Sequence, residues 1–290
     1  MTHPPNLVVF GFGYSAQALA LARRLAPKGW KIAATYRSDP EPLRAMGVQP
    51  IALDDAETLT AALAEARAVL ITAAPTAEGC PALPVLVPAL ARAGAFPDWI
   101  GYLSTTGVYG DREGGWVFED GRLAAQSLEG ARRVSAERDW LEVGRGMGLT
   151  VTLHRLPGIY GPGRSALDRL RAGTARRYAA PGQVFSRIHV DDLAAGLEAS
   201  IARPRAGGVY NLCDDEPAPN SEVIAYAAGL LGMAPPPEEP LDLAAMSPAA
   251  RRFYAETKRV SNARAKAELG WRPAYPTYRE GLAAILTSGG

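Results

Sequence analysis

The segment Leu7-Val8-Val9-Phe10-Gly11-Phe12-Gly13-Tyr14-Ser15-Ala16 decides the fold of this chain. Its apolar start predicts a buried strand, and apolar residues at helical spacing over 14–26 predict a helix. Between them lies a G-x-G-x-x-A turn, in which the first glycine permits the tight turn and the second lets a phosphate approach the backbone. Free amides at the helix start would hold phosphates. The segment therefore predicts a dinucleotide site at Gly11, Gly13, Tyr14 and Ser15; the alternative is an ordinary glycine turn.

Strands and helices go on alternating through the first half of the chain. We expect further strands at 31–36, 50–53, 69–72, 99–104 and 149–153. The helices between them are expected at 58–66, 82–93 and 127–143. Gly144, Gly146 and Gly148 are expected to end the 127–143 helix, since glycine is a poor helix former. Such alternation predicts an α/β protein with a Rossmann-type, doubly wound parallel sheet.

The pattern becomes less regular after Pro157. A helix is expected from Ile188, a strand at 208–212, and helices at 222–231, 262–269 and 279–286 between proline-rich turns. We therefore predict a smaller, mostly helical C-terminal substrate lobe. The Rossmann domain is expected to hold residues 1–160 together with about 186–212, and the substrate-binding lobe about 161–185 and 213–290.

Composition excludes several classes of function. The 290 residues include 31 basic and 30 acidic side chains, a net charge of +1, which gives no basic surface for nucleic acid. No apolar run approaches the ~20 residues of a membrane span, and the start has no signal-peptide pattern. Two cysteines, Cys80 and Cys213, make no disulfide framework, and three scattered histidines give no metal-ligand spacing. We expect a cytoplasmic protein with no metal, no membrane contact and a small-molecule substrate.

The second strand ends at Tyr36-Arg37-Ser38, where a dinucleotide site usually carries an acidic residue for the ribose hydroxyl. An arginine there can pair with a 2′-phosphate through charge-assisted hydrogen bonds. Arg37 and Ser38 are therefore expected to contact NADP(H) in preference to NAD(H). The alternative is a solvated surface arginine.

Several motifs together resemble one known family. They are Leu103-Ser104-Thr105-Thr106-Gly107-Val108-Tyr109-Gly110, the His154–Gly163 segment, the Arg187–Ala194 segment, Val209–Leu212 and Leu269-Gly270-Trp271. In this order, over nearly the whole chain, they resemble the extended short-chain dehydrogenases/reductases, whose members include nucleotide-sugar epimerases and dehydratases. The resemblance implies that Asp54 contacts the adenine, that Ala73, Ala74 and Pro75 line the cofactor, and that Pro157 touches the nicotinamide. It also allows a homodimer.

The chain departs from the family at the catalytic residues. Members usually use a Ser/Thr that polarises the substrate oxygen and a Tyr-x-x-x-Lys pair whose tyrosine acts as acid or base. Thr105 matches the first position, but the tyrosine and lysine positions fall on Glu129 and Arg133. A literal Tyr254-x-x-x-Lys258 occurs in the C-terminal lobe, where we expect ordinary neighbours on a helix.

Four side chains are candidates for the chemistry. Thr105 would hold the substrate oxygen, and Arg133 could keep a positive charge near the ribose but cannot exchange a proton. Glu129 could act as acid or base if it is buried; the alternative is a surface residue paired with Arg132 or Arg133. Tyr109 is a further candidate, although packing of its turn is the favoured role.

The substrate is expected to contact Tyr160, Arg187 and Arg251 (or Arg252). The arginines could bind an anionic group of the substrate; the equally weighted alternative is that they pack between the lobes or lie solvated at the surface. His154 is expected in the core, and His189 as a helix cap or a lining residue. Together these observations favour an NADP(H)-binding oxidoreductase or epimerase/dehydratase that acts on a small polar substrate with an atypical active site. The alternative is a non-catalytic NADP(H) sensor.

Overall fold

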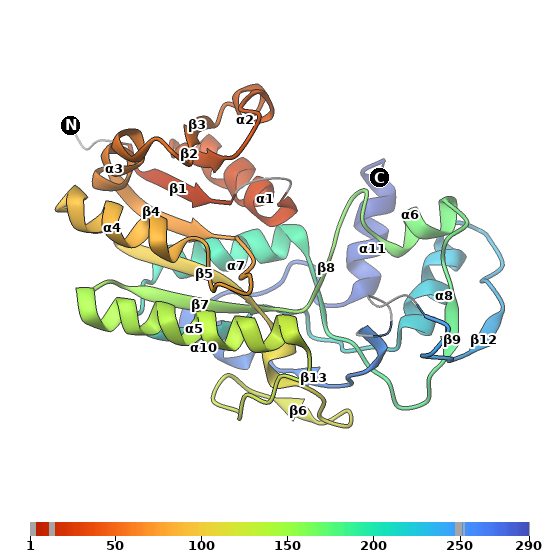
Figure 1. Ribbon diagram of the computed structural model, residues 1–290. Coiled ribbons are helices and arrows are strands. Elements are labelled where there is room, and N and C mark those ends of the chain that lie inside the picture. The colour runs from red at the N-terminus through yellow and green to blue at the C-terminus, as the bar shows by residue number, and fades with distance from the viewer. Residues whose placement is uncertain (1–3, 12–14, 247–250, 252, 290) are drawn as a thin grey trace. The chain divides into compact units, whose positions relative to one another are not determined.

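The computed structural model describes residues 4–11, 15–246, 251 and 253–289, which form two compact units (Figure 1). Unit 1 comprises 1–105, 131–155 and 194–210, and unit 2 comprises 106–130, 156–193 and 211–290. Residues 106–130 and 186–193 thus pack with unit 2, whereas the sequence patterns had grouped them with the Rossmann domain. Arg112, for example, donates its amide to the Thr257 carbonyl at 3.1 Å, and the amide of Asp214 donates to the Arg187 carbonyl at 2.8 Å.

Unit 1 is built on a seven-stranded sheet in the order β11-β7-β5-β4-β1-β2-β3. The strands are β1 (Asn6–Phe10), β2 (Lys31–Tyr36), β3 (Gln49–Ala52), β4 (Ala66–Ile71), β5 (Trp99–Thr105), β7 (Val151–Leu156) and β11 (Gly208–Asn211). The pairings β1–β2, β1–β4, β2–β3 and β4–β5 are all parallel. The predicted doubly wound α/β fold is confirmed. Strand order reverses at β1, and ligands of such sheets bind at this switch point, beyond the carboxyl ends of the strands.

Helices cover both faces of this sheet. They are α1 (Ala16–Leu25), the 3-10 turn η1 (Ala26–Lys28), α2 (Glu41–Ala45), α3 (Ala56–Ala64), α4 (Leu83–Ala93), α5 (Leu128–Met147) and α7 (Val190–Ala202). Apolar side chains of α3, α4 and α5 share one core with Val8 and Phe10 of β1. On the other face α1 meets α7, where Glu198 pairs with Arg24 and Lys28. Because β1 is buried on both faces, its apolar residues run without interruption.

The end of α5 differs from the prediction. The helix continues through Gly144 and Gly146 to Met147, and Gly148 then takes a left-handed φ of 70°. The amide of Leu149 donates to the carbonyl of Gly144 at 2.9 Å, a Schellman-type ending. A Cβ at Gly144 would come within 3.0 Å of Val151, so this glycine allows close packing on β7 instead of stopping the helix.

Unit 2 is a set of short strands and helices. They are η2 (Thr106–Tyr109), β6 (Trp116–Val117), β8 (Gly158–Tyr160), α6 (Ala166–Arg171), β9 (Arg177–Ala179), β10 (Arg187–His189), α8 (Asn220–Leu230), β12 (Glu238–Pro240), β13 (Arg259–Val260), α10 (Ala263–Leu269) and α11 (Tyr278–Thr287). Three two-stranded parallel pairs, β10–β8, β12–β9 and β13–β6, join segments distant in sequence. Helices α6, α8 and α11 share one apolar core.

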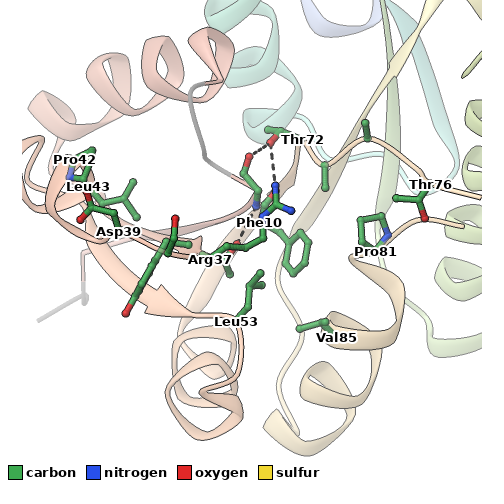
Figure 2. Close-up of a pocket in the computed structure, with 16 residues that line it drawn as sticks. Phe10, Arg37, Asp39, Pro42, Leu43, Leu53, Thr72, Thr76, Pro81 and Val85 are labelled. Atoms are coloured by element: carbon green, nitrogen blue, oxygen red, sulfur yellow. Dashed lines mark hydrogen bonds between the residues drawn. The ribbon is translucent and has the colours of Figure 1, made fainter. Parts of the chain in front are cut away.

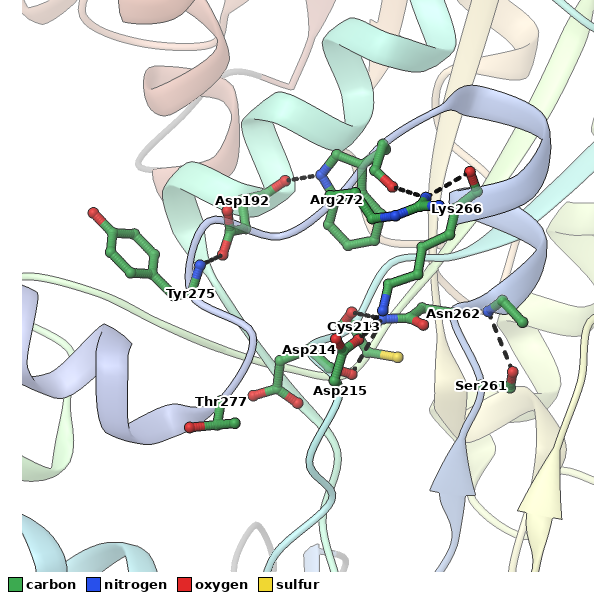
Figure 3. A network of polar contacts seen from close by, with 12 residues as sticks. Asp192, Cys213, Asp214, Asp215, Ser261, Asn262, Lys266, Arg272, Tyr275 and Thr277 are labelled. Carbon is green, nitrogen blue, oxygen red and sulfur yellow. Dashed lines mark hydrogen bonds and ion pairs between the residues drawn. The ribbon is translucent and has the colours of Figure 1, made fainter.

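Asp192 ties the 271–275 loop of unit 2 to the start of α7. Its carboxylate accepts the amides of Ala274 at 2.6 Å and Tyr275 at 2.9 Å, and its carbonyl accepts the indole N–H of Trp271 at 3.2 Å (Figure 3). Below it, the Asn262 amide donates to the Cys213 carbonyl at 2.8 Å and to Asp215 at 2.7 Å. The Asp-Asp-Leu-Ala and Leu-Gly-Trp motifs therefore meet in one structural network.

Inside unit 1, a buried ion pair fastens α5 to the sheet. Arg155 of β7 contacts Glu137 of α5 through Nη2 at 2.8 Å and Nε at 3.1 Å, and the Ser104 hydroxyl of β5 donates to Glu137 at 2.5 Å. The two charged side chains are only 5% and 3% exposed. A buried carboxylate with these three hydrogen bonds stabilises the fold only while its partners remain.

Substitution of Glu137 tests this arrangement. We expect Glu137→Ala to lower the free energy of unfolding by about 3–5 kcal/mol, because the Arg155 guanidinium would be left buried without its counter-ion. The control is Arg138→Ala, which removes an exposed neighbour on the same helix and is expected to change stability by less than about 0.5 kcal/mol. Urea unfolding followed by circular dichroism measures both; similar losses would refute the anchoring role of Glu137.

A second expectation concerns acid stability. His154 lies fully buried in β7, with Nε2 3.0 Å from the Ser200 hydroxyl, and burial lowers its pKa to about 3. In the unfolded chain this histidine has its ordinary pKa of about 6.5. Below that pH it is therefore protonated in the unfolded chain but still neutral in the folded one. The stability contributed by His154 is complete above pH 6.5 and is lost as the pH falls from there toward 3. Between pH 7.5 and 5 this loss is about 2 kcal/mol. Urea unfolding of His154→Gln should show a correspondingly shallower pH dependence, and an unchanged dependence would contradict the assignment.

Candidate functional site

The carboxyl ends of β1 to β4 surround a cavity of about 650 Å³ within unit 1 (Figure 2). Its walls come from the segments that follow these strands and from the start of α4: Phe10, Gly11, Thr35, Tyr36, Arg37, Ser38, Asp39, Pro42, Leu43, Leu53, Thr72, Ala73, Ala74, Thr76, Pro81 and Val85. The size lies within the range of small-molecule and cofactor pockets. The position is the one that the sheet's switch point predicts.

Gly11 lines this cavity at a point where two chain segments approach each other closely. It has a left-handed φ of 81°, and a Cβ there would lie 3.1 Å from the Ala73 amide nitrogen and 3.2 Å from the Ala73 Cβ. Its own amide donates to the Thr35 hydroxyl at 2.9 Å. Ser15 caps α1 by accepting the Ala18 amide at 3.3 Å. Only glycine combines this conformation with so close an approach of two chain segments, and the arrangement fits a dinucleotide at the start of α1.

The other predicted cofactor residues divide into three groups. Arg37, Ser38, Ala73 and Ala74 line the cavity, as Figure 2 shows for Arg37. Asp54 is exposed in the turn after β3, where Leu53 faces the cavity, and Thr76 lines it in place of Pro75. Pro157 belongs to unit 2. Gly13 and Tyr14 lie outside the described residues.

Arg133, at the family's lysine position, is held against the sheet within unit 1. Its guanidinium donates from Nη1 to the Tyr102 hydroxyl at 3.1 Å and to the Leu103 carbonyl, and lies 5.5 Å from the centre of the Tyr102 ring. Burial raises the pKa of Tyr102 to about 12, so this phenol stays protonated. Thr105 is the last residue of β5 and is half-buried. Arg133 thus places a fixed positive charge close to the end of the strand that carries Thr105.

The two remaining catalytic candidates belong to unit 2. Tyr109 is fully buried, and its hydroxyl donates to the Asn211 side-chain oxygen at 2.8 Å, which supports the packing role. Glu129 is exposed in the first turn of α5. Its carboxyl group therefore lacks the burial that we expected general acid or base catalysis to require.

The Tyr254 and Lys258 pair is structural, but not in the way the sequence suggested. Lys258 lies outside any helix, just before β13, and donates to the Gly110 carbonyl at 2.9 Å. The Tyr254 hydroxyl accepts from Asn220 at 3.1 Å. The expectation of helix neighbours was wrong because the chain becomes extended after 255.

Unit 2 contains a second cavity of about 650 Å³, which brings together two of the three predicted substrate residues, Tyr160 and Arg187. Arg251 does not line it; its guanidinium instead donates to the carbonyls of Leu243 and Ala244 at 2.9 and 3.1 Å. His189 caps α7 by accepting the Asp191 amide at 3.3 Å, one of its expected roles. Among the described residues, no three acidic, histidine or cysteine side chains gather into a metal-binding group, and no helix is long and apolar enough to cross a bilayer.

Several residues that line the two cavities were not predicted from the sequence. In unit 1 these include Thr35, Leu53 and Val85, and in unit 2 Phe185 and Phe253. Thr35 could have been found, because a polar residue interrupts an apolar strand just opposite the glycine turn. The two phenylalanines lie 68 positions apart in the sequence, and no local pattern links them.

Comparison with known proteins places the chain among dinucleotide-binding folds. No protein-family model matches it. A solved structure of a conserved protein of unknown function from Silicibacter pomeroyi is 46% identical, with a TM-score of 0.88, over 98% of this chain and 99% of that one. A structure assigned as an NAD-dependent epimerase/dehydratase from Methylobacillus flagellatus is 26% identical over 99% of both chains, with a TM-score of 0.73.

Two further proteins share less sequence or less length. The dTDP-glucose 4,6-dehydratase from Bacillus anthracis, solved in complex with NAD, has a TM-score of 0.76 at 18% identity over 98% of this chain and 96% of that one, which shows the fold. A 3-diazoavenalumate denitrifying reductase from a Streptomyces species is 33% identical over 135 residues, and the match spans 43% of each protein. Sheet order, ordered motifs and full-length structural matches agree: the chain belongs to the extended short-chain dehydrogenase/reductase superfamily, the group of the NAD-dependent epimerases and dehydratases.

Proposed function

We propose that the chain is an NADP(H)-dependent oxidoreductase that reduces a small polar substrate. The observation that carries this proposal is the unit 1 cavity, in which the close approach at Gly11 and the Arg37 side chain occur together. Gly11 fits the pyrophosphate of a dinucleotide, and Arg37 supplies a cation beyond β2, at the usual ribose position. Asp39 lines the same cavity, but it follows the strand end by three residues.

Reduction is favoured over epimerisation and dehydration. The latter reactions depend on a side chain that moves protons on and off the substrate, and here Glu129 is exposed while Arg133 cannot release a proton. A reductase is also among the relatives, although the match covers less than half of it. When bound, the nicotinamide would supply the hydride. The chain's own residues then need only to orient the substrate carbonyl and stabilise charge.

Thr105 and Arg133 are the residues proposed for that task. The Thr105 hydroxyl, at the end of β5, would donate to the substrate oxygen, and the fixed guanidinium of Arg133 would stabilise negative charge near the end of the same strand. Loss of a general acid typically lowers a rate by about 10²–10⁴-fold. The proposal therefore implies a slow reductase, with solvent as the source of the proton.

A nucleotide sensor without turnover is the second candidate. The buried Tyr109 and the exposed Glu129 favour it, because the Tyr109 hydroxyl is engaged with Asn211 inside unit 2 and Glu129 lies at the surface. A sensor would bind NADP(H) as the reductase does, so turnover and not binding separates the two.

Cofactor choice is tested at Arg37. We expect Arg37→Gln to weaken NADPH binding by about 10- to 100-fold, since a charge-assisted hydrogen bond contributes about 1.5–3 kcal/mol. NADH binding should stay within twofold. Arg44→Gln is the matched control, because Arg44 is exposed on α2, pairs with Glu41 and does not line the cavity. Fluorescence titration measures all four affinities, and a tenfold preference of the wild type for NADH would overturn the assignment.

Turnover is tested at Thr105. With NADPH and a panel of aldehydes and ketones, we expect Thr105→Val to lower kcat/KM by about 10²-fold or more, because a donor to the developing charge is removed. Thr105→Ser should restore most of the rate, and the NADPH affinity of both variants should equal that of the wild type. Undiminished activity in Thr105→Val would exclude the oxygen-holding role. No turnover by the wild type on any carbonyl would favour the sensor.

A further inference from the structure

Two threonine hydroxyls hold Gly11 at the carboxyl end of β1. The Gly11 amide donates to the Thr35 hydroxyl at 2.9 Å, and the Thr72 hydroxyl donates to the Gly11 carbonyl (Figure 2). Thr35 belongs to β2 and Thr72 directly follows β4, the strands on either side of β1. Both the donor and the acceptor of the Gly11 backbone are therefore bonded to side chains of the flanking segments.

These two hydrogen bonds act on the two backbone torsion angles of Gly11. The amide lies on the φ side of the residue and the carbonyl on the ψ side, so together the bonds restrain both angles. Glycine has more backbone freedom than any other residue and loses the most conformational entropy when it is ordered. The restraint therefore matters more at this position than it would at a residue with a side chain.

Thr72 also fastens the segment after β4 against the glycine turn. Its amide donates to the Phe10 carbonyl at 3.1 Å, and its hydroxyl lies 3.4 Å from the same carbonyl oxygen. The next residue is Ala73, whose amide nitrogen would lie 3.1 Å from a Cβ at Gly11. The close approach that restricts position 11 to glycine is thus secured directly beside it by the Thr72 contacts.

The two hydroxyls contribute hydrogen bonds and not volume. Thr35 is 3% exposed in a strand whose other buried residues are apolar, and Thr72 follows an apolar strand. Valine has the same branched shape, and a hydroxyl buried among apolar side chains is unfavourable unless it is hydrogen-bonded. Both threonines line the unit 1 cavity, and both bond the residue that the proposed dinucleotide approaches.

We propose that Thr35 and Thr72 are positioning residues, which hold the Gly11 turn in its ligand-binding conformation before a dinucleotide binds. The inference rests on the proposed function, because that function assigns the pyrophosphate to the Gly11 turn. Such preorganisation strengthens binding by removing the entropic cost of ordering the site. The threonines then affect NADPH and NADH equally, since both carry the pyrophosphate, whereas Arg37 affects only the dinucleotide with a 2′-phosphate.

The test compares the NADPH and NADH affinities of Thr35→Val and Thr72→Val with those of the wild type. We expect each variant to bind both dinucleotides about 3- to 10-fold more weakly, because one hydrogen bond to the turn is lost. The ratio of the two affinities should not change, and Thr72→Ser, which keeps the hydroxyl, should bind as the wild type does. A loss confined to one dinucleotide would overturn the positioning role.

A probe without the pyrophosphate separates positioning from a general change in the cavity. The probe 2′-AMP carries the adenine and the 2′-phosphate alone, so wild type and Thr72→Val should bind it equally, while Arg37→Gln should bind it more weakly. If Thr72→Val weakened 2′-AMP by the same factor as NADPH, the whole cavity would have changed and the proposal would fail.

Thr152→Val is the matched control. Thr152 is fully buried in β7 of the same sheet, its hydroxyl donates to the Arg205 carbonyl at 3.1 Å, and it does not line the cavity. This variant loses the same kind of hydrogen bond, so its stability should fall while its dinucleotide affinities stay within twofold. An affinity loss equal to that of Thr72→Val would contradict a specific effect on the turn.

A measurement on the wild type alone decides the matter if the valine variants do not fold. By NMR hydrogen exchange without nucleotide, we expect the Gly11 amide to exchange about tenfold or more slowly than an unstructured glycine amide. Exchange at the unstructured rate would show that the turn is not held in advance, and would overturn the proposal.

These outcomes are distinct from those that test the proposed function. If the wild type binds both dinucleotides and the valine variants weaken neither, only the positioning role fails. If the wild type prefers NADH, and the variants weaken both dinucleotides equally, the NADP(H) assignment fails and the positioning role stands. If the wild type binds neither, both fail.

Discussion

The close approach of two chain segments at Gly11 is the constraint on which the candidate cofactor site depends. With φ at 81° and the Ala73 amide 3.1 Å from where a Cβ would stand, no side chain fits at this position. The Thr35 hydroxyl accepts the Gly11 amide at 2.9 Å, which ties the end of β1 to β2 as well. Three neighbouring strands thus converge on one turn. The cavity beyond them follows from that convergence.

A second constraint is the way α5 is attached to the sheet. Buried Glu137 links it to Arg155 and Ser104, and Arg133 is fastened to Tyr102 and the Leu103 carbonyl. The position of α5 at which the family usually has its lysine therefore carries an arginine fixed by two hydrogen bonds here. This change retains positive charge near the end of β5 but gives up proton transfer. A slow reductase and a sensor are both consistent with this change. The reductase is preferred, because hydride transfer does not need a proton from this side chain.

The fold was predictable from local pattern, but the site only in part. Strand and helix alternation predicted the parallel sheet, and the turn at Gly11 predicted where its ligand cavity lies, because both depend on neighbours in sequence. The continuation of α5 beyond Gly144 was missed, since it depends on contact with Val151. Arg251 was grouped with Arg187 by charge alone, yet loop carbonyls hold it outside the cavity lining. Phe185 and Phe253 meet only through the tertiary fold.

In the proposed function, the unit 1 cavity holds the dinucleotide through the segments after β2 and β4. Hydrogen–deuterium exchange with and without NADPH tests it most directly, because it reports each backbone segment separately. We expect slower exchange over 35–43 and 71–76, with NADH giving weaker protection around Arg37 at the same concentration. Unchanged exchange in both segments, or protection confined to unit 2, would contradict it.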